Sequence, residues 1–221
     1  MNHTSLSEAR RVFGDDMLGA EEVFAALGFD PLASVVGEGR AALDRLSFDG
    51  QTLMRAADDG MMLVLRVAQG QAALTILELA DRFPGSADLA KSYRESWFAA
   101  EPFAATETCK LGWALVDKQP FAESRNRSYG EQDAILDERR RLVGLALRRR
   151  TAIEIVYDTL LYAAARRERL LQSEWDWSSS PTSDGGWVSA GQFDDQGLRL
   201  LGYSRAVRFD SLGLCATVDG F

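Results

Sequence analysis

The chain has 221 residues and carries 33 acidic against 25 basic side chains, which gives a formal net charge of −8. A chain of this length buries roughly 70% of the surface that it exposes when unfolded, so it needs neither a disulfide nor a metal to fold. It contains no run of eighteen apolar residues and no signal-peptide pattern, so we predict no membrane-spanning helix and expect a cytoplasmic protein. We expect a single domain over residues 1–221.

The charge is unevenly distributed along the chain. Residues 1–124 hold 11 basic and 19 acidic side chains, residues 125–169 hold 11 and 7, and residues 170–221 hold 3 and 7. All the basic residues of the middle block are arginines, whose planar guanidinium groups suit bidentate pairing with carboxylates or phosphates. Two interpretations stay open for the triplet Arg148, Arg149 and Arg150 in this block: a phosphate-contacting patch, or internal partners of the acidic flanks. The second is favoured because the net charge of the chain repels a polyanion.

Short helices are predicted in the N-terminal part, residues 1–58. Gly14 and Gly28 are suitable stops for the first two, because glycine readily adopts the left-handed conformation that ends many helices. A third helix is predicted over Thr52–Asp59, and Asp59-Gly60 is typical of a turn.

The mixed middle part, residues 59–171, contains three predicted strands, at 61–67, 74–79 and 111–116. The spacing of the first two favours a hairpin with a short loop. The polar segment from Phe121 to Tyr129 is typical of a loop that moves or holds an anion.

A helix from about residue 148 to 169 is predicted to be the central and most buried element. Its apolar residues form a stripe that is wide for a surface helix. Its polar residues recur every four positions, so Arg150, Glu154 and Asp158 form one row in which neighbours can touch. We interpret this row as the wetted edge of the helix; the alternative is that Glu154 and Asp158 form an acidic site.

The C-terminal part, residues 172–221, is rich in predicted strands, at 187–193, 198–203 and 212–218. A flexible turn is predicted from Ser178 to Gly186. The overall prediction is an α+β domain in which a twisted, mainly antiparallel sheet packs against the central helix.

Trp175 and Trp177 are two positions apart, so on a strand they share one face, and Ser178 and Ser179 follow them. These four residues are candidates for a binding site, although core packing is favoured because a tryptophan has a large area to bury. The W-S-S sequence followed by a small-residue turn and an aromatic strand resembles the core of C-type-lectin-like domains. The chain lacks the paired cysteines and the calcium-binding E-P-N or Q-P-D signature of the sugar-binding members, so the resemblance does not imply carbohydrate binding.

Several classes of chemistry are disfavoured by the residue inventory. The one histidine, His3, lies close to the start of the sequence, which argues against His-dependent triads and His-ligated metal sites. No P-loop motif occurs, and Cys109 and Cys215 lack the spacing of a zinc site or a disulfide framework. We therefore expect no cofactor and no metal.

Two functional classes remain. The first is a noncatalytic protein that binds another protein or a second copy of itself through an acidic surface and an arginine-rich patch. The second is a carboxylate-based hydrolase or transferase that uses a divalent metal, for example at Glu154 and Asp158. The first is favoured because 22 arginines and 5 tryptophans are present, and these residue types anchor interfaces. Nucleic acid is disfavoured as a partner.

Overall fold

The computed structural model describes residues 4–33, 35, 40, 43–67, 74–82 and 97–220, and it confirms the α+β class. Its α-helices are α1 Leu6–Phe13, α2 Ala20–Leu27, α4 Gly50–Asp58, α5 Ile76–Arg82, α6 Pro102–Thr106, α7 Tyr129–Val143 and α8 Ala152–Arg166. Three short 3-10 helices are η1 Gly14–Asp16, η2 Trp97–Ala100 and η3 Ala122–Ser124.

The strands of the described residues form two larger sheets and one small one. The first sheet has the order β2 Met17–Leu18, β4 Met61–Arg66, β5 Gly112–Asp117, β11 Ala216–Gly220 and β6 Arg148–Arg149. The second has the order β10 Leu212–Gly213, β7 Trp175–Pro181, β8 Trp187–Asp194 and β9 Gly197–Tyr203. A third pairs β1 Thr4–Ser5 with β3 Arg45–Leu46. All pairs are antiparallel except β2 with β4 and β7 with β10.

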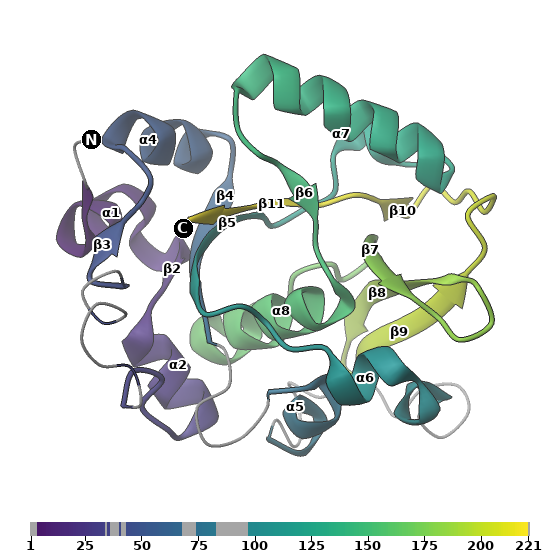
Figure 1. Ribbon diagram of the computed structural model, residues 1–221, viewed down its shortest axis with the longest axis horizontal. Helices are drawn as coiled ribbons and strands as arrows, with labels where there is room; N and C mark the ends of the chain where they lie inside the picture. Colours follow the sequence, from purple (N-terminus) through teal and green to yellow (C-terminus); the bar gives the residue numbers. More distant parts are fainter. Residues whose placement is uncertain are drawn as a thin grey trace.

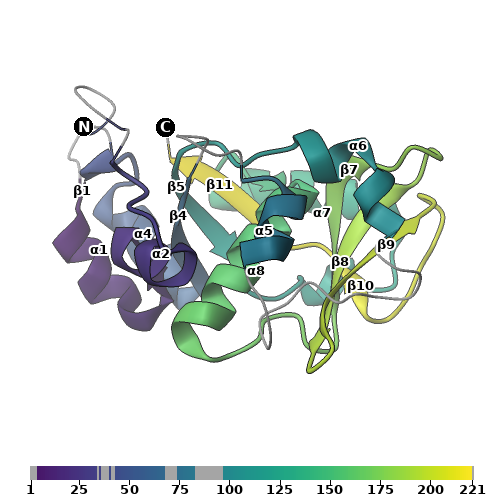
Figure 2. The same ribbon diagram turned by 90° about the horizontal axis from the view of Figure 1, so that it is seen from below.

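Helix α8 lies between the two larger sheets (Figure 1). It packs against β2 and β4 of the first sheet and against β7 and β8 of the second, and α2, α5 and α6 cover it from outside (Figure 2). Twelve of its fifteen residues are buried, as expected for a helix with apolar residues on most of its circumference. Helices α4 and α7 lie on the other side of the first sheet (Figure 1).

The central helix begins later than the sequence predicted. Thr151 is its N-cap, and Thr151 and Glu154 form a capping box in which each side chain accepts a hydrogen bond from the backbone N–H of the other residue. Arg150 immediately precedes the cap, and the two residues before it, Arg148 and Arg149, pair with Thr217 and Ala216 as strand β6. The predicted helical row through Arg150 was therefore wrong, because Arg150 precedes the helix.

The strand predicted at 74–79, and with it the hairpin to 61–67, is wrong. Residues Ile76–Arg82 form α5, and Thr75 and Glu78 exchange hydrogen bonds in the manner of a capping box. This T-x-x-E signature was present in the sequence but was outweighed by the apolar residues around it. Strand β4 instead pairs with β5, about fifty residues further along the chain.

Two further boundaries differ in the C-terminal part. Strand β7 continues through Ser178 and Ser179 to Pro181, so the predicted turn from Ser178 is shorter than expected. The strand predicted at 212–218 is two strands, because β10 pairs with β7 in the second sheet and β11 crosses to β5 in the first. No helix in the described part of the chain combines the length and the apolar character needed to cross a membrane.

Candidate functional site

A network of buried ion pairs joins the two sheets through α8. Arg66 on β4 is only 1% exposed. Its Nε and Nη2 donate to the two carboxylate oxygens of Asp158 at 3.0 and 2.6 Å, and its Nη1 donates to Glu154 at 3.0 Å. Because these groups are shielded from water, each charge depends on its partner.

Arg148 and Arg150 extend this network in opposite directions. The Arg148 guanidinium donates two hydrogen bonds to Glu154, at 2.7 and 2.6 Å, and two to Asp219 on β11. Arg150 donates to Asp158 at 3.1 Å and twice to Asp176 on β7, at 3.0 and 2.7 Å. We refer to these residues together as the buried ion network: Arg66, Arg148, Arg150, Glu154, Asp158, Asp176 and Asp219.

The arginines determine the protonation state of Glu154. Burial on its own raises the pKa of this carboxyl group, but Arg66 and Arg148 outweigh burial and hold the pKa at about 2. At Asp176 burial prevails over Arg150, and the pKa is raised. Burial also raises the pKa of the free thiols Cys109 and Cys215 well above the ordinary value, so both stay protonated.

The interpretation of Glu154 and Asp158 as a wetted edge is wrong, since they are 3% and 0% exposed. All four of their carboxylate oxygens accept hydrogen bonds from arginines. A metal ion at these carboxylates would have to displace guanidinium groups. Among the described residues, no three His, Cys, Asp or Glu side chains are placed to share a metal ion.

The third member of the arginine triplet is also turned inward. Arg149 is 6% exposed, pairs with Asp133 at 2.9 Å, and donates to the backbone carbonyls of Tyr129 and Trp177. Its guanidinium carbon lies 3.9 Å from the centre of the Tyr129 ring, in a cation–π contact. The triplet therefore pairs internally with carboxylates, which was the favoured interpretation of the sequence.

The tryptophan pair and the two serines lie inside the second sheet. Trp175 and Trp177 are 5% and 0% exposed, and Trp177 packs edge-on against Tyr129 with 5.1 Å between the ring centres. Ser178 donates its hydroxyl hydrogen to the carbonyl of Val188, and Ser179 donates to that of Arg150. In this arrangement the hydroxyls bond to the backbone.

Four of the predicted site residues do meet around one pocket of about 660 Å³ beside the N-terminus of α8: Arg148, Arg149, Glu154 and Ser179. Six of the charged side chains in its wall are paired with one another. Arg149 pairs with Asp133, Arg148 with Glu154, and Arg140 with Asp137. This pocket is therefore a polar surface over the buried ion network.

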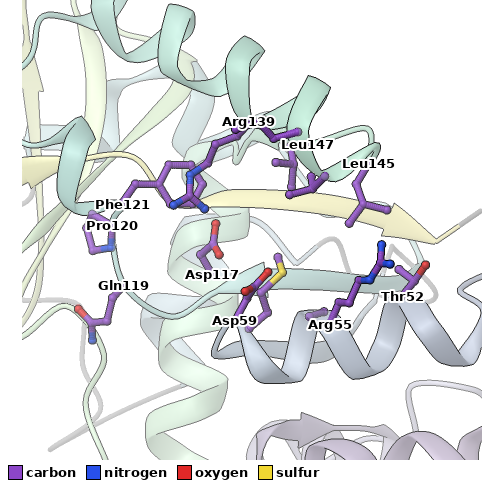
Figure 3. A pocket seen from close by; sticks show the side chains of 14 residues that line it. Thr52, Arg55, Asp59, Asp117, Gln119, Pro120, Phe121, Arg139, Leu145 and Leu147 are labelled. Atoms are coloured by element: carbon purple, nitrogen blue, oxygen red, sulfur yellow. The ribbon is translucent and has the colours of Figure 1, made fainter.

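A second pocket, of about 510 Å³, lies between α4 and α7 and was not predicted as a site; we call it the α4–α7 pocket. Figure 3 shows α4 with Thr52 and Arg55 along one wall and α7 with Arg139 along the other. The ends of β4 and β5 contribute the floor, where Met61 and Asp117 are register partners. Its remaining lining residues are Ala56, Asp59, Gln119, Pro120, Phe121, Leu142, Val143, Leu145 and Leu147.

Asp117 is a partly buried acid on the floor of this pocket. It ends β5, and its Oδ2 accepts a hydrogen bond of 2.8 Å from the N–H of Ala216, the first residue of β11. Burial raises its pKa to about 6, because that hydrogen bond and the more distant arginines do not offset the loss of water. Within the described residues Asp117 has no ion-pair partner, which distinguishes it from the carboxylates of the buried ion network.

The rim of the α4–α7 pocket exposes apolar side chains at the end of α7. Leu142 is 75% exposed and Val143 is 38% exposed, whereas Leu147 beside them is 5% exposed. On the same helix, Arg139 stacks on the Phe121 ring at 3.8 Å and donates to Glu123 at 2.9 Å. The rim therefore combines exposed apolar groups with an ordered arginine, a composition found at protein interfaces.

Two sequence signals lay close to this pocket. The segment from Phe121 to Tyr129 was noted as a polar loop, and its first residue lines the pocket. The Leu142-Val143 pair follows three arginines in α7. Such an isolated apolar pair does not continue a helical apolar stripe, so its spacing does not predict that it is buried in the core. Neither signal indicated that α4, which comes much earlier in the chain, forms the facing wall.

Comparison with protein-family models, with curated proteins and with solved structures finds no match for this chain.

Proposed function

We propose that this chain is a noncatalytic protein-binding module and that its partner docks on the α4–α7 pocket and the end of α7. The observation that supports this most directly is the exposed pair Leu142 and Val143 at the rim of a pocket of about 510 Å³. Exposed apolar groups beside a concavity are typical of surfaces that another macromolecule covers. The partner is another protein or a second copy of this chain.

The buried ion network has a structural role in this proposal. Its arginines and carboxylates pair with one another between the sheets, so they offer little to a substrate. The alternative function, a divalent-metal hydrolase or transferase, would require a different pair of acids. Asp59 and Asp117 both line the α4–α7 pocket and are the pair that favours it.

Metal titration separates the two proposals. Isothermal titration of the protein with Mg²⁺, Mn²⁺ and Ca²⁺ is expected to give no binding heat for a binding module. Saturable binding that is lost in Asp117→Asn, together with metal-dependent hydrolysis of a phosphoester or peptide, would instead establish the enzymatic function.

The docking surface is tested with Leu142→Glu, which places a charge where the partner is expected to bury an apolar group. Proteins retained by the wild type but lost with this variant are purified and titrated back against both forms. We expect binding to weaken at least tenfold, which is about 1.4 kcal/mol. Sedimentation of the purified chain at several concentrations reports self-association through the same surface.

Phe24→Glu is the matched control, because Phe24 is 56% exposed but lies on α2, away from the pocket. It introduces the same charge on another helix and should leave binding unchanged. Equal loss of binding in both variants would show that charge alone is responsible and would contradict the proposed docking surface.

A further inference from the structure

We propose that the partner presents a lysine whose side chain enters the α4–α7 pocket and places its ammonium group against Asp117. This inference rests on the proposed function and adds the chemistry of the contact. The open carboxylate on the pocket floor, the apolar side chains above it and the negative charge of the chain support it together.

One carboxylate oxygen of Asp117 accepts a hydrogen bond, and the other has no hydrogen-bond donor among the described residues. Oδ2 accepts the Ala216 N–H, while no described donor bonds to Oδ1. In Figure 3 the carboxylate stands on the floor, below Arg139 and Phe121 and near Asp59. A partly buried carboxylate with an open oxygen gains most from a cation that enters and replaces the missing water.

The apolar lining suits an aliphatic stem above the charged end. Met61 and Leu147 are buried in the pocket wall, and Leu145 lies beside them. Lysine can pack its methylene chain along such a surface while its ammonium group reaches a polar end. The volume of about 510 Å³ exceeds one side chain, so residues that flank the lysine would fill the remainder.

Lysine fits this floor better than arginine. An ammonium group is a compact charge that can bond to a single oxygen, whereas a guanidinium group gains most from two oxygens presented side by side. At Asp117 one of the two oxygens already accepts the hydrogen bond from the backbone N–H of Ala216. Asp59, on the same pocket wall, is a second acceptor within the lining.

The two arginines in the wall do not prevent entry of a cation. Arg139 bonds to Glu123 and stacks on the Phe121 ring, and its charge lowers the pKa of Asp117 only in part. Arg55 lies on the opposite wall in Figure 3. The chain as a whole is acidic, since it carries 33 acidic against 25 basic side chains and has a net charge of −8. Such a field attracts a basic partner over distances of about a Debye length.

Binding should follow the ionisation of Asp117. The ammonium group binds the carboxylate rather than the carboxylic acid, and the pKa of about 6 places the change near neutral pH. The affinity should therefore be constant above about pH 7 and fall about tenfold on going to about pH 5. The charged groups that face Asp117 or share its pocket are Arg150, Arg139 and Asp176, together with Asp59 and Arg55.

The experiment uses Nα-acetyl-lysine methylamide as the probe and follows the backbone amide signals of ¹⁵N-labelled protein. Millimolar binding is expected, with shifts confined to the pocket lining. The norleucine analogue, which keeps the stem but has no charge, should not bind, and the arginine analogue should bind more weakly. Asp117→Asn should abolish lysine binding, because its amide can still accept the Ala216 N–H but carries no charge.

Two outcomes would overturn the inference. One is equal binding of the lysine and norleucine analogues, and the other is unchanged binding in Asp117→Asn. The proposed function is judged separately, by the effect of Leu142→Glu on the purified partner. If Leu142→Glu weakens that complex while Asp117→Asn does not, the docking surface stands and the lysine contact is wrong.

Discussion

The buried ion network and the α4–α7 pocket use the same types of side chain in opposite ways. In the network, Glu154 and Asp158 are saturated by arginines that reach them from β4 and from the segment before α8. In the pocket, Asp117 has a backbone N–H but no ion-pair partner within the described residues. Charges that are paired internally hold elements together, whereas a charge left open toward solvent is available to a ligand.

The pKa values express this difference. Glu154 is buried but has a pKa lowered to about 2, while burial raises that of Asp117 to about 6. Burial acts in the same direction on both, so the arginines account for the contrast. The presence of arginine partners therefore separates a structural carboxylate in one region from a candidate binding carboxylate in the other.

Leu160→Asp is expected to have the largest effect. Leu160 is fully buried on α8, the helix that carries Glu154 and Asp158, and belongs to the hydrophobic core. An unpaired charge there should unfold the protein or cost more than about 4 kcal/mol. Circular dichroism during thermal unfolding measures this. A variant as heat-stable as the wild type would show that α8 is not the core of the fold.

Arg66→Met should have the next largest effect on stability. It removes the guanidinium group that Asp158 and Glu154 share and leaves their charges partly unpaired, for an expected loss of about 3–5 kcal/mol. Urea unfolding monitored by tryptophan fluorescence gives the free energy of unfolding. The control is Arg141→Met, whose side chain is 74% exposed and should change stability by less than about 0.5 kcal/mol. Similar losses in both would remove the distinction between paired and exposed arginines.

Asp117→Asn should stabilise the protein at neutral pH, whereas the two preceding substitutions should destabilise it. The folded pKa of about 6 lies above the ordinary value of 3.8, so ionisation opposes folding, and the wild type loses stability as pH rises through this window. Above about pH 6 the variant should be more stable, on the order of 1 kcal/mol after allowance for water in the pocket. Below about pH 4 the two should be equally stable. Chemical unfolding across this range tests the sign, and a destabilised variant at neutral pH would mean that Asp117 is already paired.

The smallest expected effect is the binding of nucleic acid, which should not be detectable. The arginines that resemble a phosphate-binding patch in sequence are paired with carboxylates, and the chain is negative overall. Gel-shift titrations with random duplex DNA, single-stranded DNA and RNA at low salt should show no complex. Micromolar binding that falls steeply as salt rises would indicate that an exposed part of the surface outweighs the net charge.

Much of the secondary structure could be predicted because it follows from local patterns. The strands at 61–67 and 111–116 and the apolar helix that became α8 have clear periodicity or caps. The error at 74–79 arose because a short apolar run is compatible with either a strand or a helix, and α5 is decided by its capping residues and its contact with α8.

The sequence by itself determined the α+β composition, the apolar character of α8 and the residue types of the ion network. Only the tertiary structure decided which charges meet. Arg66 and Asp158 are 92 positions apart, and Asp117 meets Ala216 across 99. Local spacing describes neighbours within one element, while pairing, burial and the shape of a pocket depend on how distant elements pack. For that reason Glu154 and Asp158 appeared to be a wetted row, and the wall formed by α4 and α7 had no sequence signal.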